Sequence, residues 1–232
     1  MCGRYTLTEL REQFVSQFGS VEVEELAFTP RFNIAPTQRA PVLRVLDRRL
    51  EVIPMGWGFL PKWSHSPIIN AMQETLADKP TFKDAFMHRR CLVPADGFFE
   101  WQKTQGRKLP VRFVLPTRAV FYFAGLWDTF AHPKSAATQK DLFPATDAVS
   151  NDRLLTFLII TTPANDIVRP VHTRMPVIVR PEVADTWLDP VADLSTLNSV
   201  LRHPRNDELV SYTVSPLVNN VRNDSPQCIV PN

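Results

Sequence analysis

The sequence has few cysteines, few glycines and little net charge, and each of these shortages limits what the protein can be. The three cysteines, Cys2, Cys91 and Cys228, are too few and too scattered for a disulfide framework or a zinc site. A formal net charge of +2 provides no overall field that would attract nucleic acid. Seven glycines stand against 21 prolines, so we expect short elements joined by stiff loops.

Long apolar runs are also missing, which bears on location. No apolar stretch is long enough to cross a membrane. Arg4, Glu9, Arg11 and Glu12 interrupt the hydrophobic region that a secretory signal would need. We therefore expect no membrane partner and no secretion, with a location in the cytoplasm, at the nucleoid of a bacterium, or in the nucleus of a eukaryote. In such a reducing compartment a thiol at position 2 stays free.

The common signatures of metal, nucleotide and hydrolase chemistry are absent as well. The chain has no HExxH, CxxC or P-loop pattern, and no serine or cysteine lies in a GxSxG-like turn. His65, His88, His132 and His203 have no partners at metal-ligand spacing. We predict neither a metal site nor a cofactor.

The distribution of apolar residues predicts one α+β domain over residues 1–232, with a barrel-like core of mixed or antiparallel β-sheet and a few flanking short helices. Strands are expected at 41–46 and 50–55 as a hairpin, at 91–95 and 98–102 around an Asp96-Gly97 turn, and at 108–115, 119–125, 154–162 and 209–214. Helices are expected at 8–19, 181–188 and 193–201, with a short one within 74–87. We expect an extended loop at 29–37 and an inserted, partly mobile loop at 131–153.

The first residues carry the most distinctive chemistry. If Met1 is removed, Cys2 offers an α-amine and a thiol on adjacent carbons, with ordinary pKa values of about 8 and about 8.5. Such a 1,2-aminothiol condenses with an aldehyde to an imine, and the thiol then closes a five-membered thiazolidine. By position alone a small buried hydrophobic side chain is the simpler interpretation of Cys2, so the rest of the chain has to decide.

Three further polar residues lie in apolar or tightly turned contexts. Asn70 follows two isoleucines, Glu100 is flanked by aromatic residues, and His172 lies between proline turns. A carboxylate among aromatic residues tends to have a raised pKa, and histidine can move a proton near neutral pH. Each also has a simpler interpretation, since Glu100 could point outward from a half-exposed strand and His172 could lie in a surface loop.

The tryptophans of the glycine-punctuated stretch 55–63 are expected to differ. Trp57 suits the core, whereas Trp63, between Pro61-Lys62 and Ser64-His65, suits the surface, where an indole can stack on a nucleic-acid base.

Six stretches, taken in order, resemble the motifs of the SOS response-associated peptidase (SRAP) family, whose bacterial and animal members protect abasic sites in DNA. These are Met1-Cys2-Gly3-Arg4-Tyr5, 31–37, 57–61, 69–71 with Glu74, 91–101, and His172-Thr173-Arg174-Met175-Pro176. The resemblance extends from residue 2 to about residue 223, where 218–223 is similar to the closing motif of the family. It implies a protein that loses Met1 and captures abasic sites in single-stranded DNA.

The resemblance also implies a role for each matching residue. Cys2 would be the nucleophile, Asn70 would position the terminus, and Glu100 and His172 would move protons during opening of the sugar and imine formation. The DNA contacts would come from Arg4 and Arg174 on phosphates, from Asn33 and Pro36 in a loop along the strand, from Trp63 as a stacking or wedging ring, and from Thr161 lining the site. One position departs from the family, which usually has Asn-Ala-Arg where this chain has Asn70-Ala71-Met72.

Three functions remain open on the sequence. The leading hypothesis is a monomer that cross-links to abasic sites in single-stranded DNA through a thiazolidine, with weak AP-lyase activity as a side reaction of the imine. The second is a cysteine peptidase with an N-terminal nucleophile, including self-removal of Met1. The third is a noncovalent binder of single-stranded nucleic acid that uses the basic residues between Lys103 and Arg118 together with the aromatic side chains.

Overall fold

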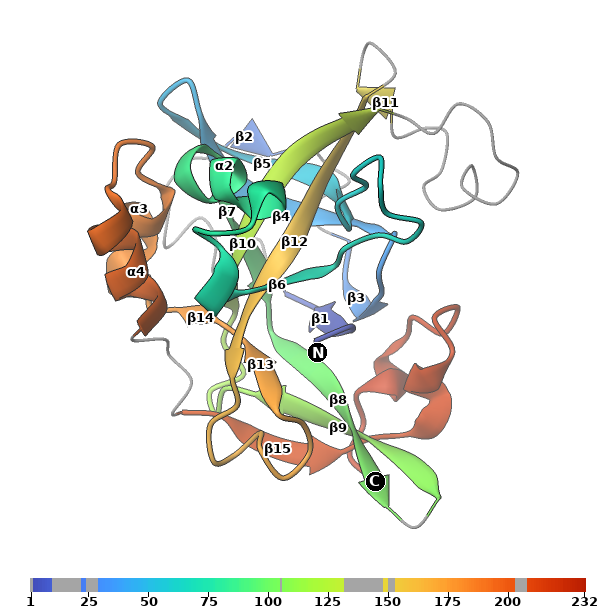
Figure 1. Ribbon diagram of the computed structural model, residues 1–232. Coiled ribbons are helices and arrows are strands. Elements are labelled where there is room, and N and C mark those ends of the chain that lie inside the picture. Colours follow the sequence, from blue (N-terminus) through green and yellow to red (C-terminus); the bar gives the residue numbers. More distant parts are fainter. Residues whose placement is uncertain are drawn as a thin grey trace.

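Two β-sheets, which join strands from distant parts of the sequence, form the centre of the structure (Figure 1). The computed structural model describes residues 2–9, 22–23, 29–104, 106–131, 148–149, 153–202 and 208–232. The strands are β1 (Tyr5–Leu7), β2 (Glu22–Val23), β3 (Arg31–Ile34), β4 (Arg39–Leu46), β5 (Arg49–Trp57), β6 (Asn70–Met72), β7 (Arg90–Ala95), β8 (Gly97–Thr104), β9 (Arg107–Val114), β10 (Phe121–Ala131), β11 (Ala148–Val149), β12 (Arg153–Pro163), β13 (Arg174–Pro176), β14 (Ile178–Val179) and β15 (Val210–Thr213).

The larger sheet closes on itself. Its strand order is β11-β12-β10-β7-β4-β5-β2, and β12 also pairs in parallel with β5, with Thr156 opposite Gly56. The strands β12, β10, β7, β4 and β5 therefore form a ring, which removes the exposed edges that an open sheet would have. This arrangement confirms the expected α+β fold with a barrel-like core.

The smaller sheet has the strand order β15-β9-β8-β1-β3 and holds the start of the chain between two longer strands. Tyr5 of β1 sends its ring out of this sheet into the barrel, where its centroid lies 5.2 Å from that of Trp57 and 5.8 Å from that of Phe123. All three rings are buried. Burial of each such side chain contributes about 1.5–3 kcal/mol, so Tyr5 fixes the amino-terminal strand against the barrel.

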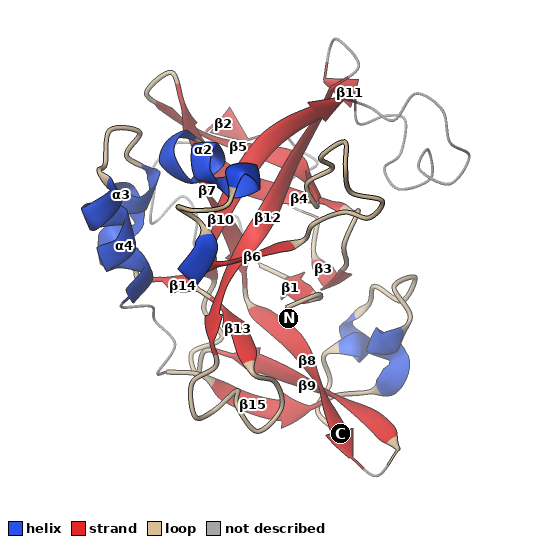
Figure 2. Cartoon of the chain, viewed as in Figure 1, coloured by secondary structure: helices blue, strands red, loops and turns tan. Residues whose placement is uncertain are grey.

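Short helices cover the outside of the barrel on one side, where α2 (Pro80–His88), α3 (Ala184–Leu188) and α4 (Leu194–Arg202) gather (Figure 2). Arg90 ties two of them to β7, because its guanidinium donates to the carbonyls of Phe86 and Trp187 at 2.8 Å each. The remaining helical turns are the 3-10 segments η2 (Gln73–Thr75), η4 (Pro181–Val183), η5 (Pro216–Asn219) and η6 (Pro226–Cys228). No helix in the described ranges combines the length and the apolar character that crossing a membrane requires.

Several local predictions are confirmed. The expected hairpin is β4–β5, and its turn residues Asp47 and Arg48 have φ values of 49° and 61°, as a tight two-residue hairpin turn requires. Helical turns cover 181–188 and 194–202, as expected. The predicted helix at 8–19 and the predicted loop at 131–153 lie mostly outside the described residues.

Two local predictions are wrong. Residues 31–34 of the expected loop form β3, because β1 supplies a partner strand from a distant part of the sequence. The strands on either side of Asp96 exist, but they do not pair with each other: β7 pairs with β10 and β4, and β8 pairs with β1 and β9. The six residues of β7 are all buried, so this strand needs a neighbour on both sides, and the chain crosses from the barrel to the smaller sheet at Asp96.

Candidate active site at the start of the chain

The position of Cys2 follows from the pairing of β1 with β8. Tyr5 lies opposite Phe98, and the N–H of Phe99 donates to the carbonyl of Arg4 at 3.0 Å. Continued toward the terminus, this antiparallel register places Gly3 opposite Glu100. Cys2, which is fully buried, is therefore brought beside the carboxylate that the sequence singled out.

Asn70 reaches the same point from the barrel. It begins β6, which runs parallel to β12 with Asn70 opposite Ile159, and its Nδ2 donates to the carbonyl oxygen of Cys2 at 2.8 Å. The Oδ1 of the same amide is buried and has no hydrogen-bond partner in the described part of the chain. An unsatisfied buried acceptor costs free energy, so this oxygen is available to a donor that arrives at the terminus.

Glu100 faces this site rather than solvent. Its side chain is only 3% exposed, whereas the adjacent Phe99 points to the other face and packs with Val214 and Val218. The interpretation of Glu100 as an outward residue on a half-exposed strand is therefore wrong. Burial raises the pKa of the Glu100 carboxyl to about 7, which lets it both accept and release protons near neutral pH.

The thiol of Cys2 is held in its neutral form. Burial raises its pKa well above the ordinary value, and the charge of the Glu100 carboxylate raises it further. At neutral pH the site therefore contains a protonated thiol, and the Glu100 carboxyl beside it is partly protonated. The nitrogen of Cys2 is part of the peptide bond to Met1 in the translated chain, so chemistry at this nitrogen requires removal of Met1.

His172 lies half-buried in the loop between β12 and β13. The N–H of Arg174 donates to its Nδ1 at 3.0 Å, and burial lowers its pKa. The same Nδ1 also lies 3.1 Å from the carbonyl oxygen of Arg174, so the backbone of Arg174 holds the ring in place whichever ring nitrogen carries the proton. The lowered pKa favours the neutral imidazole, which has one donor nitrogen and one acceptor nitrogen.

Arg174 is held by the turn that follows Asn70. Its Nη1 donates to Oε1 of Glu74 at 2.6 Å, and its Nη2 donates to Oε2 at 2.9 Å and to the carbonyl of Thr161 at 2.6 Å. The hydrogen bonds from Arg174 lower the pKa of Glu74. Asn70 and Glu74, four residues apart, thus fix Cys2 and Arg174 along one edge of the barrel.

Arg4 and Asn33 contact the carboxyl-terminal segment, residues 215–232. The Nη1 of Arg4 donates to Oδ1 of Asn33 and to the carbonyl of Val218, both at 2.7 Å, and its guanidinium lies 5.5 Å from the ring centroid of Trp101. The buried amide of Asn33 donates to the carbonyls of Val218, Asn220 and Asn223. The side chain of Asn33 therefore holds this segment in place, and any DNA contact nearby would involve the turn after β3, where Pro36 lies half-buried.

The two tryptophans differ as expected: Trp57 is buried, whereas Trp63 is 66% exposed in the loop after β5. Thr161 is buried, with its hydroxyl 3.3 Å from the carbonyl of Ala71. Glu74 and Asp96 also shape the site, but the sequence alone predicts no role for either. Their partners Arg174 and Arg112 lie far from them in the sequence, so no local pattern reveals the two ion pairs.

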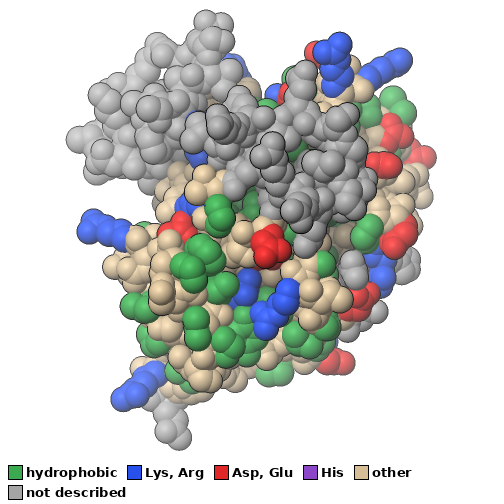
Figure 3. All heavy atoms as spheres, turned by 180° about the vertical axis from the view of Figure 1, so that it is seen from behind, with side chains coloured by type: hydrophobic (Ala, Val, Ile, Leu, Met, Phe, Trp, Pro, Cys, Tyr) green, Lys and Arg blue, Asp and Glu red, His purple; other side chains and the backbone are tan. Residues whose placement is uncertain are grey.

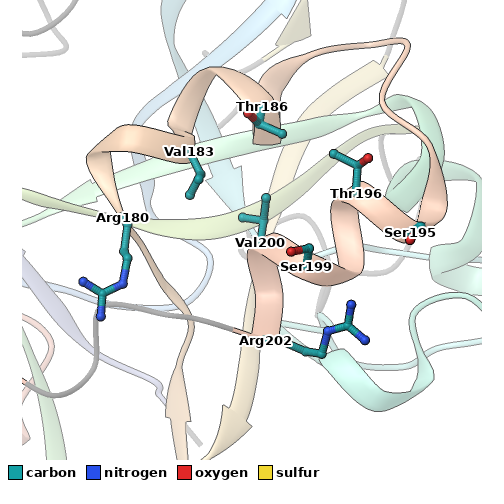
Figure 4. A pocket seen from close by; sticks show the side chains of 8 residues that line it. All are labelled: Arg180, Val183, Thr186, Ser195, Thr196, Ser199, Val200 and Arg202. Atoms are coloured by element: carbon teal, nitrogen blue, oxygen red, sulfur yellow. The ribbon is translucent and has the colours of Figure 1, made fainter.

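A pocket of about 440 Å³ lies away from this site, between η4, α3 and α4. Hydroxyl side chains and the two arginines Arg180 and Arg202 line it, but their guanidinium groups point away from each other (Figure 4), and the lining contains no thiol, carboxylate or imidazole. The face seen from behind carries lysines and arginines scattered among other side chains rather than in a stripe (Figure 3). No group of three or more histidine, cysteine or acidic residues suited to a metal ion occurs in the part of the chain that the structure describes. We therefore take the residues around Cys2 as the candidate site.

Comparison with known proteins finds matches that extend over nearly the whole chain. Residues 1–221 match the family model described as SOS response associated peptidase (SRAP). The chain is 32% identical to the abasic site processing protein YoqW of Bacillus subtilis (strain 168), over 99% of each chain, and 27% identical to YedK of Escherichia coli (strain K12), over the full length of both. A crystal structure of a protein from Bacteroides thetaiotaomicron, 22% identical and covered completely, shares the fold with a TM-score of 0.77.

Proposed function

The chain belongs to the SOS response associated peptidase (SRAP) family, and on that premise we propose that it captures abasic sites in single-stranded DNA as a covalent cross-link through a freed Cys2. Curated relatives in the same family are named abasic site processing proteins. An abasic deoxyribose opens to an aldehyde, which is the electrophile that an aminothiol can hold as a ring.

The observation that carries the proposal is the contact between Asn70 and Cys2. The amide of Asn70 holds the carbonyl of Cys2 at 2.8 Å, and its unsatisfied Oδ1 can accept a hydrogen bond from the α-amine that appears when Met1 is lost. Such a bond would orient the lone pair of the amine and fix the terminus beside Glu100. A small hydrophobic residue buried for packing alone would not need these polar neighbours.

The first covalent step is formation of an imine. The α-amine of Cys2 adds to C1′ of the open sugar, and the resulting carbinolamine loses water to give the imine. Glu100, with a pKa of about 7, accepts the proton that the nitrogen releases and returns it to the departing hydroxyl. The neutral imidazole of His172 supplies a second N–H donor for the oxygen of the sugar ring as it opens.

The second covalent step is closure of the ring. Because the thiol is neutral at rest, it becomes nucleophilic only when its proton is removed, and Glu100 is the base beside it. The sulfur bonds to the imine carbon and a proton reaches the imine nitrogen, so the thiazolidine forms without loss of any further group. Amine first and thiol second is therefore the order that these proton affinities favour.

The two alternatives receive no comparable support. A cysteine peptidase attacks with a thiolate, and burial beside Glu100 keeps Cys2 protonated. A purely noncovalent binder has no use for a buried aminothiol. Retention of Met1 in Asn70→Ala or Glu100→Gln protein, but not in the parent protein, would revive the peptidase.

The test uses protein shown by intact mass to lack Met1, incubated with single-stranded DNA that carries one abasic site. On a denaturing gel we expect a stable shifted band for the parent protein and for the control Cys228→Ala, and none for Cys2→Ala. Cys2→Ser should form only an imine that borohydride can trap. A stable cross-link from Cys2→Ser without reduction would contradict closure by sulfur.

A further inference from the structure

Both edges of the Arg174 guanidinium that could bind a phosphate are blocked before any DNA arrives. Arginine binds a phosphate with two parallel hydrogen bonds, from either its Nη1–Nη2 edge or the edge that contains Nε. Glu74 occupies the first edge with both carboxylate oxygens, at 2.6 and 2.9 Å. The second edge is closed as well, because Nε is buried without a partner and Nη2 also donates to the carbonyl of Thr161.

The two partners of this ion pair differ in their freedom to move. Arg174 begins β13, its side chain is 17% exposed, and it is anchored to β12 through Thr161. Glu74 lies in the short turn η2 and its side chain is 42% exposed. When a competing anion approaches from solvent, Glu74 can rotate away while Arg174 stays in place.

From this geometry we propose that Glu74 is an exchangeable anion that occupies the phosphate position on Arg174 and that a DNA phosphate must displace. This inference rests on the proposed function, since Arg174 is there a DNA contact. The exchange lowers the affinity for undamaged single strands, because a phosphate can bind Arg174 only after the bidentate ion pair between Arg174 and Glu74 has broken. Capture then depends on the chemistry at Cys2 more than on attraction to the backbone.

The test measures equilibrium binding of an intact, fluorescent oligothymidylate across a salt series. Glu74→Gln should tighten binding about fivefold at low salt, which corresponds to the loss of one exposed ion pair. The slope of log K against log salt should steepen by about 0.7, because in the parent protein the counterion that the phosphate releases is replaced by one that the freed Glu74 carboxylate attracts. In Glu74→Gln/Arg174→Gln protein the gain should disappear.

Asp166→Asn is the matched control. It makes the same change of charge at an exposed pair, in which Asp166 lies 3.0 Å from Arg169, and we expect it to alter binding less than twofold. Weaker binding by Glu74→Gln would show that Glu74 orients Arg174 for phosphate and would overturn the proposal. The proposal would also be overturned if Glu74→Gln and Asp166→Asn raised the DNA affinity equally, because the change in net charge alone would then explain the effect.

Failure of this inference is separable from failure of the proposed function. The oligothymidylate contains no abasic site, so its binding does not depend on Cys2, whereas the denaturing gel reports only the covalent reaction. A parent protein that cross-links normally but gains nothing from Glu74→Gln would disprove the exchange alone. Binding that tightens as expected in a protein that never cross-links would retain the exchange and reject the capture chemistry.

Discussion

The two buried carboxylates Asp96 and Glu100 lie four residues apart, near opposite ends of β1, and their surroundings differ. Asp96 accepts hydrogen bonds from the hydroxyl of Thr6, from the N–H and hydroxyl of Thr8, and from Arg112 at 2.9 Å. Both Asp96 and Arg112 have side chains that are about 5% exposed. Gly97 makes this ion pair possible, because a Cβ there would lie 2.7 Å from Nε of Arg112.

Glu100 is buried to the same degree, and burial raises the pKa of its carboxyl to about 7. The first carboxylate is part of the scaffold, since it attaches β1 to β9 through a compensated charge. The second is suited to moving protons, because its two protonation states are close in free energy at working pH. The comparison teaches that burial alone does not decide the role of a carboxylate.

The largest effect is expected from Asp96→Ala. This change leaves the guanidinium of Arg112 buried without its counter-charge and removes the acceptor for Thr6 and Thr8. Breaking a buried pair in this way costs about 3–5 kcal/mol. We expect the free energy of unfolding, measured with urea at pH 7, to fall by that amount, while Asp166→Ala at the exposed pair changes it by less than about 1 kcal/mol.

Removal of the charge at Glu100 should raise the free energy of unfolding, whereas the change at Asp96 lowers it. Its carboxyl binds a proton more tightly in the folded chain, with a pKa of about 7 against 4.5, so its contribution to stability is complete below pH 4.5 and is lost as the pH rises through 7. Glutamine mimics the protonated form and does not titrate. Glu100→Gln should therefore match the parent protein near pH 4.5 and exceed it by roughly 3 kcal/mol at pH 8.

Urea denaturation at both pH values checks this, with Asp96→Asn as the comparison that should lose stability at pH 8. A Glu100→Gln protein that is less stable at pH 8 would mean that Glu100 is compensated as Asp96 is. The same protein should cross-link at least about 100-fold more slowly, since a positioned general acid or base contributes at least that factor.

The sequence predicted those parts of the molecule that depend on neighbours in the chain. The β4–β5 turn, the burial of Trp57 and the exposure of Trp63 follow from local composition, and all three are confirmed. The motif that contains Glu100 could be recognised as a candidate site. Its aromatic neighbours predicted a raised pKa, but whether the side chain faces inward could not be predicted, because that depends on strands that the sequence does not place.

Contacts between residues that are far apart in the sequence could not be predicted. Asn33 is held by carbonyls some 185 to 190 residues further on, and Asp224 accepts hydrogen bonds from the backbone of Phe32 and Asn33. An asparagine that satisfies a distant segment leaves no periodicity and no spacing that a single sequence could reveal. The pairing of β3 with β1, and the crossing of the chain between sheets at Asp96, escaped prediction for the same reason.

The smallest effect is expected at Met72, which lies at the end of β6 on the same edge as Asn70 and Glu74 and is 39% exposed. An arginine there would add one cation beside the ion pair of Arg174. We expect Met72→Arg to tighten binding of intact single-stranded DNA a few-fold and to steepen the salt slope by about 0.7. The yield of abasic cross-link at saturating protein should not change, because Met72 does not contact Cys2 or Glu100 among the described hydrogen bonds.

Val191→Arg supplies the matched control, since Val191 is 85% exposed in the turn between α3 and α4, away from Cys2. It adds the same charge without a place on the edge of the barrel, so its salt slope should stay that of the parent protein. An equal gain from both variants would mean that net charge alone governs binding. No gain from Met72→Arg would mean that the backbone of the bound strand does not pass within reach of residue 72.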